Sequence, residues 1–346
     1  MKVAFRVDAS AEIGSGHLMR CLTLAKRFIK EKNADVYFIM RELDGNLIKI
    51  VEQEGFYTII LPKTDNDYCL KGYTKWLTVP QVLDAKQSIN RLELIGPVDL
   101  LVVDSYAIDI TWECLLRPYT KKIMVIDDLA NLYDDMEGRY NDLVSRNCKR
   151  FCGPKYALLR EEFYNIKKTL QRTSLELCNI LVFFGGVDAT NETLKTLLAI
   201  EQIDNKKLII NVVVGENNPN KVQIREYCSK HPNWNYHCQI SNIAELMAEA
   251  DLALGAAGTT TWERCFLELP TVVIAVAENQ VEGAKACCKA GIIKYIGESQ
   301  NVSIESIVQS IDMLSSNEIE FMRKRCNYLM GDGGKFYELL EACCNF

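Results

Sequence analysis

The stretch KVAFRVDASAEIGSGHLMRCLTLAKRFIKEK, residues 2–32, joins an apolar run to a helical run through a loop that contains two glycines. Residues 2–8 have the composition of a buried strand, and from His17 onward apolar side chains recur with the spacing of one helix face. A strand, a glycine-containing loop and a helix in this order are typical of a parallel sheet whose faces are covered by helices.

Short apolar runs and longer helical segments alternate along the chain, and the pattern starts again after a polar, lysine-rich stretch. Because 346 residues exceed what one core usually holds, we predict an α/β protein of two Rossmann-like domains, 1–150 and 151–346, with the last helix able to pack back on the N-terminal domain. Ligands of such sheets bind outside the carboxyl ends of the strands, so we expect the site in an inter-domain cleft. The expected strands are 2–8, 36–40, 57–61, 99–105, 122–128, 142–147, 178–186, 207–215, 234–238, 251–258, 271–276 and 293–297.

Composition narrows the class of protein. The chain has 48% hydrophobic and 25% charged residues, a net charge of −6 and a pI near 5.4, which is typical of a globular protein and argues against a nucleic-acid partner. We find no signal peptide and no membrane-spanning run, so we expect a cytoplasmic protein without membrane insertion, as a monomer or a weak homo-oligomer. The fourteen scattered cysteines are expected to be free, and with three histidines we expect no metal site and no cofactor.

The loop GSGH stands where a phosphate-binding loop would stand, but it lacks the Walker lysine and, with Met at position 19, the third glycine of a dinucleotide motif. Gly14 and Gly16 are expected to let a substrate approach the backbone. His17 is a candidate base, because the start of a helix favours the neutral imidazole, which accepts a proton from water. Capping or packing is the alternative. Asp8 is a candidate to hold a substrate hydroxyl, to orient the imidazole, or only to cap the loop.

The run LGAAGTTTWERC, residues 254–265, is the second informative strand-to-helix junction. Its hydroxyls and N–H groups suit a diphosphate, and the two oxygens of Glu263 suit two ribose hydroxyls, with a solvated helix-start glutamate as the alternative. VAENQ, residues 276–280, follows the next strand, and FFGGVDATN, residues 183–191, is a weaker glycine turn. The candidate ligand contacts of this half are Gly185, Gly186, Gly258, Thr259, Thr260, Glu263, Asn279 and Gln280.

Eight segments, in order from residue 5 to about 334, together resemble the UDP-2,4-diacetamido-2,4,6-trideoxy-β-L-altropyranose hydrolases of pseudaminic acid biosynthesis. Each segment alone has little specificity, and the ordered set carries the resemblance. The segments are FRVDASAEIGSGHLMRC, VVDSYAIDITWE, IDDLAN, GPKYALLREEF, FFGGVDATN, GAAGTTTWE, ENQ and GDGG.

The resemblance implies a GT-B-like fold and a hydrolase that cleaves the sugar from UDP at the glycosidic C–O bond with inversion, releasing 2,4-diacetamido-2,4,6-trideoxy-L-altrose. The sugar is a precursor of a nonulosonic acid of bacterial surface glycans. The resemblance also implies that His17 is the base and that UDP lies mainly on the C-terminal domain, around Gly258, Thr259, Thr260, Glu263 and Asn279. When water attacks the anomeric carbon and UDP leaves, the reaction needs one base and stabilisation of the charge that develops on the diphosphate. Backbone amides can supply that stabilisation.

Four further residues are expected near the sugar from DSYAID and GPKYALLR: Asp104, Tyr106, Tyr156 and Arg160. Core packing of the tyrosines and a surface or inter-domain salt bridge of Arg160 are the alternatives. The chain departs from many relatives after IDDLAN, where it reads LYDDMEGRY, and this leaves the exact sugar open. We expect no fused acetyltransferase.

Three other functions fit parts of the pattern. A GT-B glycosyltransferase would use the same UDP site with an acceptor alcohol, and would need an apolar, basic acceptor surface that the sequence does not show. An epimerase that hydrolyses its own product would need further acid and base groups. A silent nucleotide-sugar sensor would not need a base at His17.

Overall fold

A computed structural model of the chain describes residues 1–64, 68–127, 144–203, 207–333 and 335–344. The chain forms two compact units, Met1–Ala130 with Phe336–Phe346, and Asn131–Lys335. The last helix is therefore part of the first unit. The division after Ala130 differs from the join that we predicted at 150, and the Gly153–Pro154 interruption on which that prediction rested lies inside the second unit.

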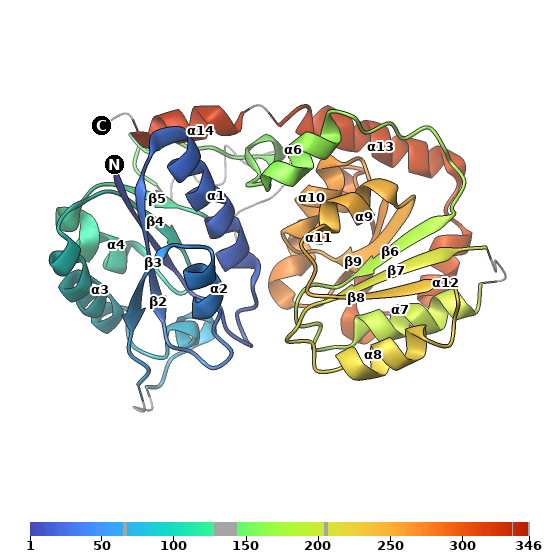
Figure 1. The fold of residues 1–346 in the computed structure, drawn as a ribbon, viewed down its shortest axis with the longest axis horizontal. Helices are drawn as coiled ribbons and strands as arrows, with labels where there is room; N and C mark the ends of the chain where they lie inside the picture. Colours follow the sequence, from blue (N-terminus) through green and yellow to red (C-terminus); the bar gives the residue numbers. More distant parts are fainter. Residues whose placement is uncertain (65–67, 128–143, 204–206, 334, 345–346) are drawn as a thin grey trace. The chain divides into compact units, whose positions relative to one another are not determined.

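The first unit contains a five-stranded parallel sheet in the order β3-β2-β1-β4-β5 (Figure 1). Its inner strands are buried on both faces, as their unbroken apolar runs predict. The strands are β1 (Lys2–Val7), β2 (Asp35–Arg41), β3 (Tyr57–Leu61), β4 (Val98–Asp104) and β5 (Thr120–Val125).

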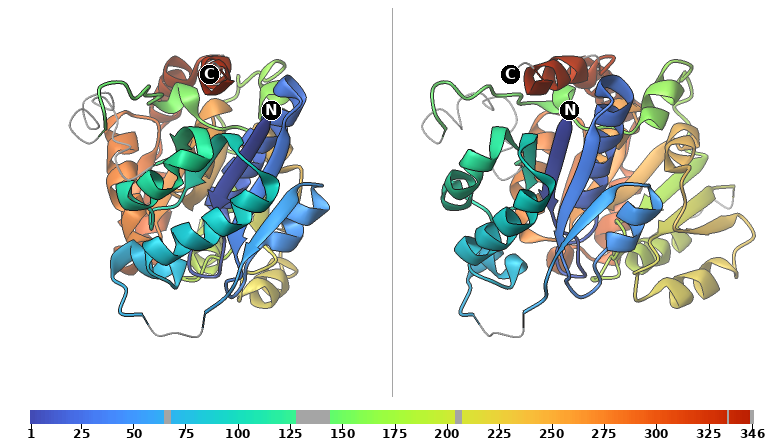
Figure 2. Two further views of the ribbon diagram at one scale, coloured as in Figure 1. Left: turned by 90° about the vertical axis from the view of Figure 1, so that its left-hand side faces the viewer. Right: turned by 60° about the vertical axis from the view of Figure 1, so that its left-hand side comes forward.

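Helices α1 and α2 cover one face of this sheet, and α3 and α4 cover the other (Figures 1 and 2). Helix α1 ends at Lys32 because Asn33 adopts the left-handed conformation and its N–H binds the carbonyl of Ile29. The helices are α1 (Gly16–Lys32), α2 (Ile48–Gln53), α3 (Gln81–Ile95), α4 (Ile110–Leu116) and α14 (Phe336–Cys344), with the 3₁₀ turns η1 (Gly72–Leu77) and η2 (Arg117–Tyr119).

The second unit contains a six-stranded parallel sheet in the order β11-β10-β9-β6-β7-β8. Alternate side chains of β6 enter two separate cores, with Ile180 and Val182 on one face and Leu181 on the other. The strands are β6 (Asn179–Phe183), β7 (Ile209–Val214), β8 (Trp234–Cys238), β9 (Leu252–Ala256), β10 (Thr271–Ala275) and β11 (Lys294–Glu298).

Helices again cover both faces of this sheet. The face of Ile180 packs against α7 and α12, and the face of Leu181 packs against α6, α9, α10 and α11. The helices are α6 (Glu161–Lys167), α7 (Glu192–Glu201), α8 (Lys221–Cys228), α9 (Ile243–Glu249), α10 (Thr260–Phe266), α11 (Glu278–Lys289), α12 (Ile304–Asp312) and α13 (Ser316–Met330), with the 3₁₀ turns η3 (Pro154–Tyr156) and η4 (Ser299–Asn301).

The direction of strand addition reverses once in each sheet, between β1 and β4 in the first unit and between β6 and β9 in the second. The carboxyl ends of the strands at such a point leave a crevice, because the connections on either side lead away from it. The two glycine-containing junctions of the sequence, after β1 and after β9, both lie at these points. The predicted fold class, two doubly wound α/β halves, is confirmed.

One predicted strand is wrong. Residues 144–147 of DLVSRN form a bend and a turn, and residues 142–143 lie outside the described residues. The N–H of Cys148 binds the carbonyl of Ser145 and closes the turn, in keeping with the turn preference of Ser and Asn. All other predicted strands are present, and all fourteen cysteines are free thiols.

Candidate active site

His17 and Asp104 meet at the reversal point of the first sheet. His17 lies in the first turn of α1, just after β1, and Asp104 is the last residue of β4. Because β1 and β4 are paired with Val7 opposite Asp104, the loop after β1 places the imidazole next to that carboxylate. Nδ1 of His17 lies 2.6 Å from Oδ1 of Asp104, and the residues are only 8% and 1% exposed.

Arg20, one turn further along α1, holds both oxygens of Asp104. Its Nε donates to Oδ2 at 2.6 Å and its Nη2 donates to Oδ1 at 2.7 Å, while the Cys21 thiol donates to Oδ2 at 3.4 Å. Burial by itself would raise the pKa of Asp104, but the charges and hydrogen bonds of Arg20 and His17 hold that pKa well below its usual range. Asp104 is therefore an ionised carboxylate at neutral pH.

The ionised state of Asp104 determines the tautomer of a neutral His17. A carboxylate only accepts hydrogen bonds, so the close contact requires a hydrogen on Nδ1. Nε2 then carries the lone pair. The arrangement leaves His17 able to accept a proton at Nε2, with its ring orientation fixed by a partner that stays charged.

Two aromatic side chains contact His17, and a third packs against both of them. The ring centroids of His17 and Tyr106 are 4.7 Å apart with an edge-to-face orientation, and Trp76 lies 6.0 Å from His17. Tyr73 contacts both Trp76 and Tyr106, at 4.9 and 5.3 Å. Tyr106 was predicted from the sequence, whereas Trp76 and Tyr73, both in η1, were missed. The sequence feature that could have found them is the pair of aromatic residues in the polar segment GYTKW. The segment alone does not show which strand end these two residues approach.

The loop between β1 and α1 is shaped by its first glycine. Gly14 has a φ of +79°, which favours glycine, and its N–H binds the carbonyl of Ser10 at 2.9 Å. The Ser10 hydroxyl accepts from the N–H groups of Glu12 and Ile13. Gly16 is the first residue of α1. These contacts position His17, and the substrate contacts predicted for Gly14 and Gly16 stay predictions.

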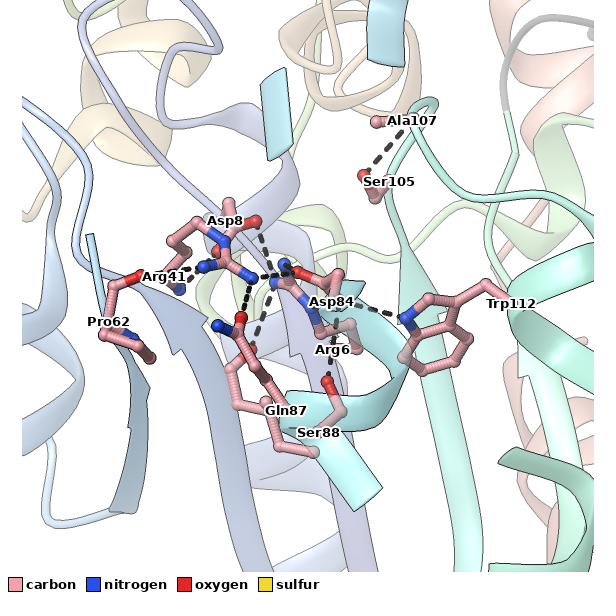
Figure 3. A network of polar contacts seen from close by, with 11 residues as sticks. Arg6, Asp8, Arg41, Pro62, Asp84, Gln87, Ser88, Ser105, Ala107 and Trp112 are labelled. Atoms are coloured by element: carbon pink, nitrogen blue, oxygen red, sulfur yellow. Dashed lines mark hydrogen bonds and ion pairs between the residues drawn. The ribbon is translucent and has the colours of Figure 1, made fainter. Parts of the chain in front are cut away.

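Asp8 belongs to a buried charge network that includes Arg6, Arg41 and Asp84 (Figure 3). Its Oδ2 pairs with Arg6 at 2.7 Å and its Oδ1 accepts from the backbone N–H of Arg41 at 2.7 Å. The carboxylate that orients His17 is thus Asp104, and the alternative that Asp8 orients it is wrong. A substrate contact of Asp8 stays a prediction.

Asp84 is the centre of this network. It binds Arg6 and Arg41, each at 2.7 Å, and accepts from the indole Nε1 of Trp112 at 2.9 Å (Figure 3). Burial alone would raise the pKa of Asp84, but the two guanidinium groups lower it to about 2. The network links the carboxyl ends of β1 and β2 to α3 and α4.

The glycine turn after β6 and the threonine turn after β9 are neighbours in the second unit. Strands β6 and β9 are paired, with Phe183 opposite Gly255, so Gly185 and Gly186 leave the sheet beside the strand that leads to Gly258, Thr259 and Thr260. Gly185 has a φ of +94°. The structure thus brings the two predicted turns to one end of one sheet.

Glu263, in α10, is tied to Arg160. The Nε and Nη2 atoms of Arg160 donate to its Oε1 at 3.2 and 3.1 Å. Burial raises the pKa of Glu263, while Arg160 and then Arg264 act to lower it. Arg160 also pairs with Glu162 at 2.8 Å, so the salt-bridge alternative for Arg160 describes its contacts in the structure.

The remaining predicted residues are Asn279 and Gln280, which follow β10 beside β9, and Tyr156, which lies in η3. Asn279 is exposed on α11, and the side-chain oxygen of Gln280 accepts from the N–H of Val276 at 3.1 Å. Tyr156 packs edge-on against Phe151 at 5.4 Å. Tyr156 and Arg160 belong to the second unit, whereas Asp104 and Tyr106 belong to the first.

The residues that the structure describes contain neither a membrane-spanning helix nor a metal-binding cluster. None of the helices there combines the length and apolar character that a membrane span requires. Among the same residues, no group of three or more His, Cys, Asp or Glu side chains could hold a metal ion.

Comparison with known proteins gives matches along most of the chain. Residues 179–335 match the glycosyltransferase family 28 C-terminal domain. An uncharacterized protein of Methanocaldococcus jannaschii is 31% identical over 82% of this chain, which spans 57% of that protein's length. A UDP-2,4-diacetamido-2,4,6-trideoxy-β-L-altropyranose hydrolase of Campylobacter jejuni is 28% identical over 84% of this chain and 97% of its own length.

A solved structure shows the same fold. The crystal structure of MurG from Acinetobacter baumannii matches 100% of this chain and 99% of its own with a TM-score of 0.60, at 12% identity. The GT-B-like fold is therefore confirmed, and so is the family resemblance found in the sequence.

Proposed function

From its homology to the UDP-2,4-diacetamido-2,4,6-trideoxy-β-L-altropyranose hydrolases, we propose that this chain is an enzyme that hydrolyses that nucleotide sugar in pseudaminic acid biosynthesis. The products are UDP and 2,4-diacetamido-2,4,6-trideoxy-L-altrose. The observation that carries the proposal is the contact of His17 Nδ1 with the ionised Asp104, which leaves Nε2 as the proton acceptor.

In the proposed reaction, a water molecule attacks the anomeric carbon on the face opposite to UDP. The water oxygen forms a bond to that carbon, and Nε2 of His17 takes its proton. The bond from the anomeric carbon to the β-phosphate oxygen breaks, and its electron pair leaves with UDP, so the configuration is inverted. Asp104 stays ionised and stabilises the imidazolium. UDP is a good leaving group, so the second carboxyl group of ordinary glycosidases is not required.

The second unit is proposed to hold UDP. The turns at Gly185–Gly186 and Gly258–Thr260 would contact the diphosphate, and Glu263 would accept the ribose hydroxyls through its carboxylate. Arg160 fixes the position of that carboxylate by its two hydrogen bonds to Oε1. Asn279, Gln280 and Tyr156 stay as proposed ligand contacts.

The test is a comparison of UDP-sugars in water enriched in ¹⁸O, with NMR of the sugar before it mutarotates. We expect UDP release to be fastest with the diacetamido-trideoxy sugar, with ¹⁸O on its anomeric carbon and an inverted configuration. Label in the phosphate, or retention, would contradict the proposal. UDP release that depends on an added alcohol would favour the GT-B glycosyltransferase, which the match to a glycosyltransferase domain keeps as the second candidate.

A further inference from the structure

Arg264 is a buried cation directly behind the turn that follows β9. Its side chain is only 1% exposed and runs from α10 back toward the end of the strand. Nη2 donates to the carbonyl of Ala256 at 2.7 Å and to the hydroxyl of Thr261 at 3.2 Å, and Nη1 donates to the hydroxyl of Thr260 at 3.3 Å.

The sheet leaves room for this guanidinium at Gly255. A Cβ at that position would lie 2.6 Å from Nη1 of Arg264 and 2.4 Å from the carbonyl oxygen of Phe183. Any side chain there would push either the guanidinium or the neighbouring strand away. Gly255 therefore leaves space for the Arg264 guanidinium at the point where the strand order of the sheet reverses.

The positive charge of Arg264 has no partner of its own in the described part of the chain. No carboxylate there forms an ion pair with it, and its buried Nε has no hydrogen-bond acceptor. The adjacent Glu263 is held by Arg160. Burial lowers the pKa of Arg264 to about 10, with Glu263 acting against it, so the group is a cation at neutral pH. A buried cation without a paired anion is costly, which favours an anion at this end of the sheet.

The contacts of Arg264 also determine that the hydroxyl oxygens of Thr260 and Thr261 act as hydrogen-bond acceptors toward it. A guanidinium only donates, so Thr260 and Thr261 accept through Oγ1 and must direct their own O–H hydrogens elsewhere. Thr260 is half-buried and begins α10, directly beyond the carboxyl end of β9. Its hydroxyl is thereby preset as a donor to an acceptor outside the sheet.

We propose that Arg264 is a positioning residue for the diphosphate of a UDP-sugar: it presets the Thr260 hydroxyl as a hydrogen-bond donor and supplies the positive charge that the diphosphate requires. This inference rests on the proposed function. The positive charge that balances the diphosphate then comes from Arg264, a side chain that is buried and does not reach the solvent.

The experiment compares UDP with uridine, which lacks the diphosphate, by ligand-observed NMR titration. Arg264→Met keeps the unbranched stem of the side chain and removes the charged guanidinium, Arg264→Lys keeps the charge, and Thr260→Val is matched by Thr260→Ser. We expect Arg264→Met and Thr260→Val to weaken UDP binding by about tenfold or more while uridine binding changes by less than about twofold. Arg264→Lys and Thr260→Ser should recover much of the lost UDP affinity.

The outcomes separate this inference from the proposed function. Equal loss of UDP and uridine affinity in Arg264→Met, or no loss in Thr260→Val, would overturn the role of Arg264 while wild-type UDP release still supports the hydrolase. If Arg264→Met does not fold, the Thr260→Val and Thr260→Ser pair decides. Wild-type protein that binds no UDP would overturn both the proposed function and this inference.

Discussion

Nδ1 of His17 lies 2.6 Å from Oδ1 of Asp104, although the two residues are 87 positions apart in the sequence. The contact exists because β1 and β4 are neighbours at the point where the strand order of the first sheet reverses. Arg20 fixes the carboxylate from the other side with two hydrogen bonds. Asp104 thus orients the imidazole, and Arg20 fixes Asp104. Four experiments test the roles of His17, of Asp104, of the nearby aromatic rings and of the buried charge network.

His17→Ala is expected to lower the rate of UDP release by about 10²-fold or more, because Nε2 of His17 is the group that we propose to take the proton from water. UDP affinity should stay within about twofold, since the proposed UDP contacts belong to the second unit. A coupled assay for UDP and a UDP titration measure the two quantities. His231→Ala, at a partly exposed position of the second unit where the imidazole lies 3.4 Å from Glu201, is the matched control and should keep wild-type turnover. Near-normal turnover of His17→Ala would disprove the base assignment.

Asp104→Asn is expected to lower kcat by about 10²–10⁴-fold with little change in KM, because an amide neither selects the Nδ1–H tautomer nor stabilises the imidazolium. The variant also removes the charged carboxylate that accepts two hydrogen bonds from Arg20, so the free energy of unfolding should fall by about 3–5 kcal/mol. The rate is therefore measured below the unfolding transition and per folded molecule. A variant with reduced stability but unchanged kcat per folded molecule would show that Asp104 has only a structural role.

Trp76→Leu is expected to raise KM for the nucleotide sugar about threefold to tenfold, because the aromatic rings around His17 would contact the sugar. UDP affinity should not change. Trp76→Phe keeps an aromatic ring and should lie between the wild type and the leucine variant. Initial-rate kinetics and a UDP titration give both quantities. An equal loss of UDP and nucleotide-sugar affinity would argue against a sugar contact of Trp76.

Asp84→Asn tests the buried charge network under β1. Arg6 and Arg41 hold the pKa of Asp84 at about 2, below its ordinary value of 3.8. The lowered pKa of Asp84 adds about 2 kcal/mol to the free energy of unfolding. This contribution is fully present above about pH 4 and is lost as the pH falls toward 2. Removal of the charge takes away the carboxylate that Arg41 pairs with and one of the two that Arg6 pairs with, so we expect a loss of about 3–5 kcal/mol at pH 7.

Urea unfolding of the wild type and of Asp84→Asn at pH 7, 4 and 3 measures this effect. The difference between the two proteins should narrow below pH 4, because protonation removes the same charge in the wild type. Asp44→Asn is the control, since Asp44 pairs with Lys63 in an exposed bridge worth about 0–1 kcal/mol. A difference that stays constant down to pH 3 would contradict the assigned pKa shift.

The alternation of apolar and helical runs was enough to predict both parallel sheets. The inner strands are buried on two faces, so their sequences are largely apolar runs that are easily recognised. The turn at Ser145 was misread as a strand because a short mixed run carries little periodicity. His17 and the GTTTWE turn could be found for a related reason, since ligand-binding residues in this fold follow directly after strands.

The partners of these residues could not be predicted. Asp8 and Asp104 both end strands, and nothing in the sequence shows that Asp104 contacts His17 while Asp8 faces Arg6. Trp76 lies in a polar segment whose position depends on the packing of η1 against the loop after β4. Arg264 reads as an ordinary helix residue until Gly255 is seen to make room for it.

The sequence by itself therefore determined the elements, their order and the strand ends at which ligands bind, because these depend on local periodicity and on turn residues. The tertiary structure decided which side chain orients His17 and which cation lies behind the Thr260 turn. Both depend on which strands are neighbours at the reversal point of each sheet. That pairing is set by contacts between residues far apart in the chain, and local sequence carries no record of them.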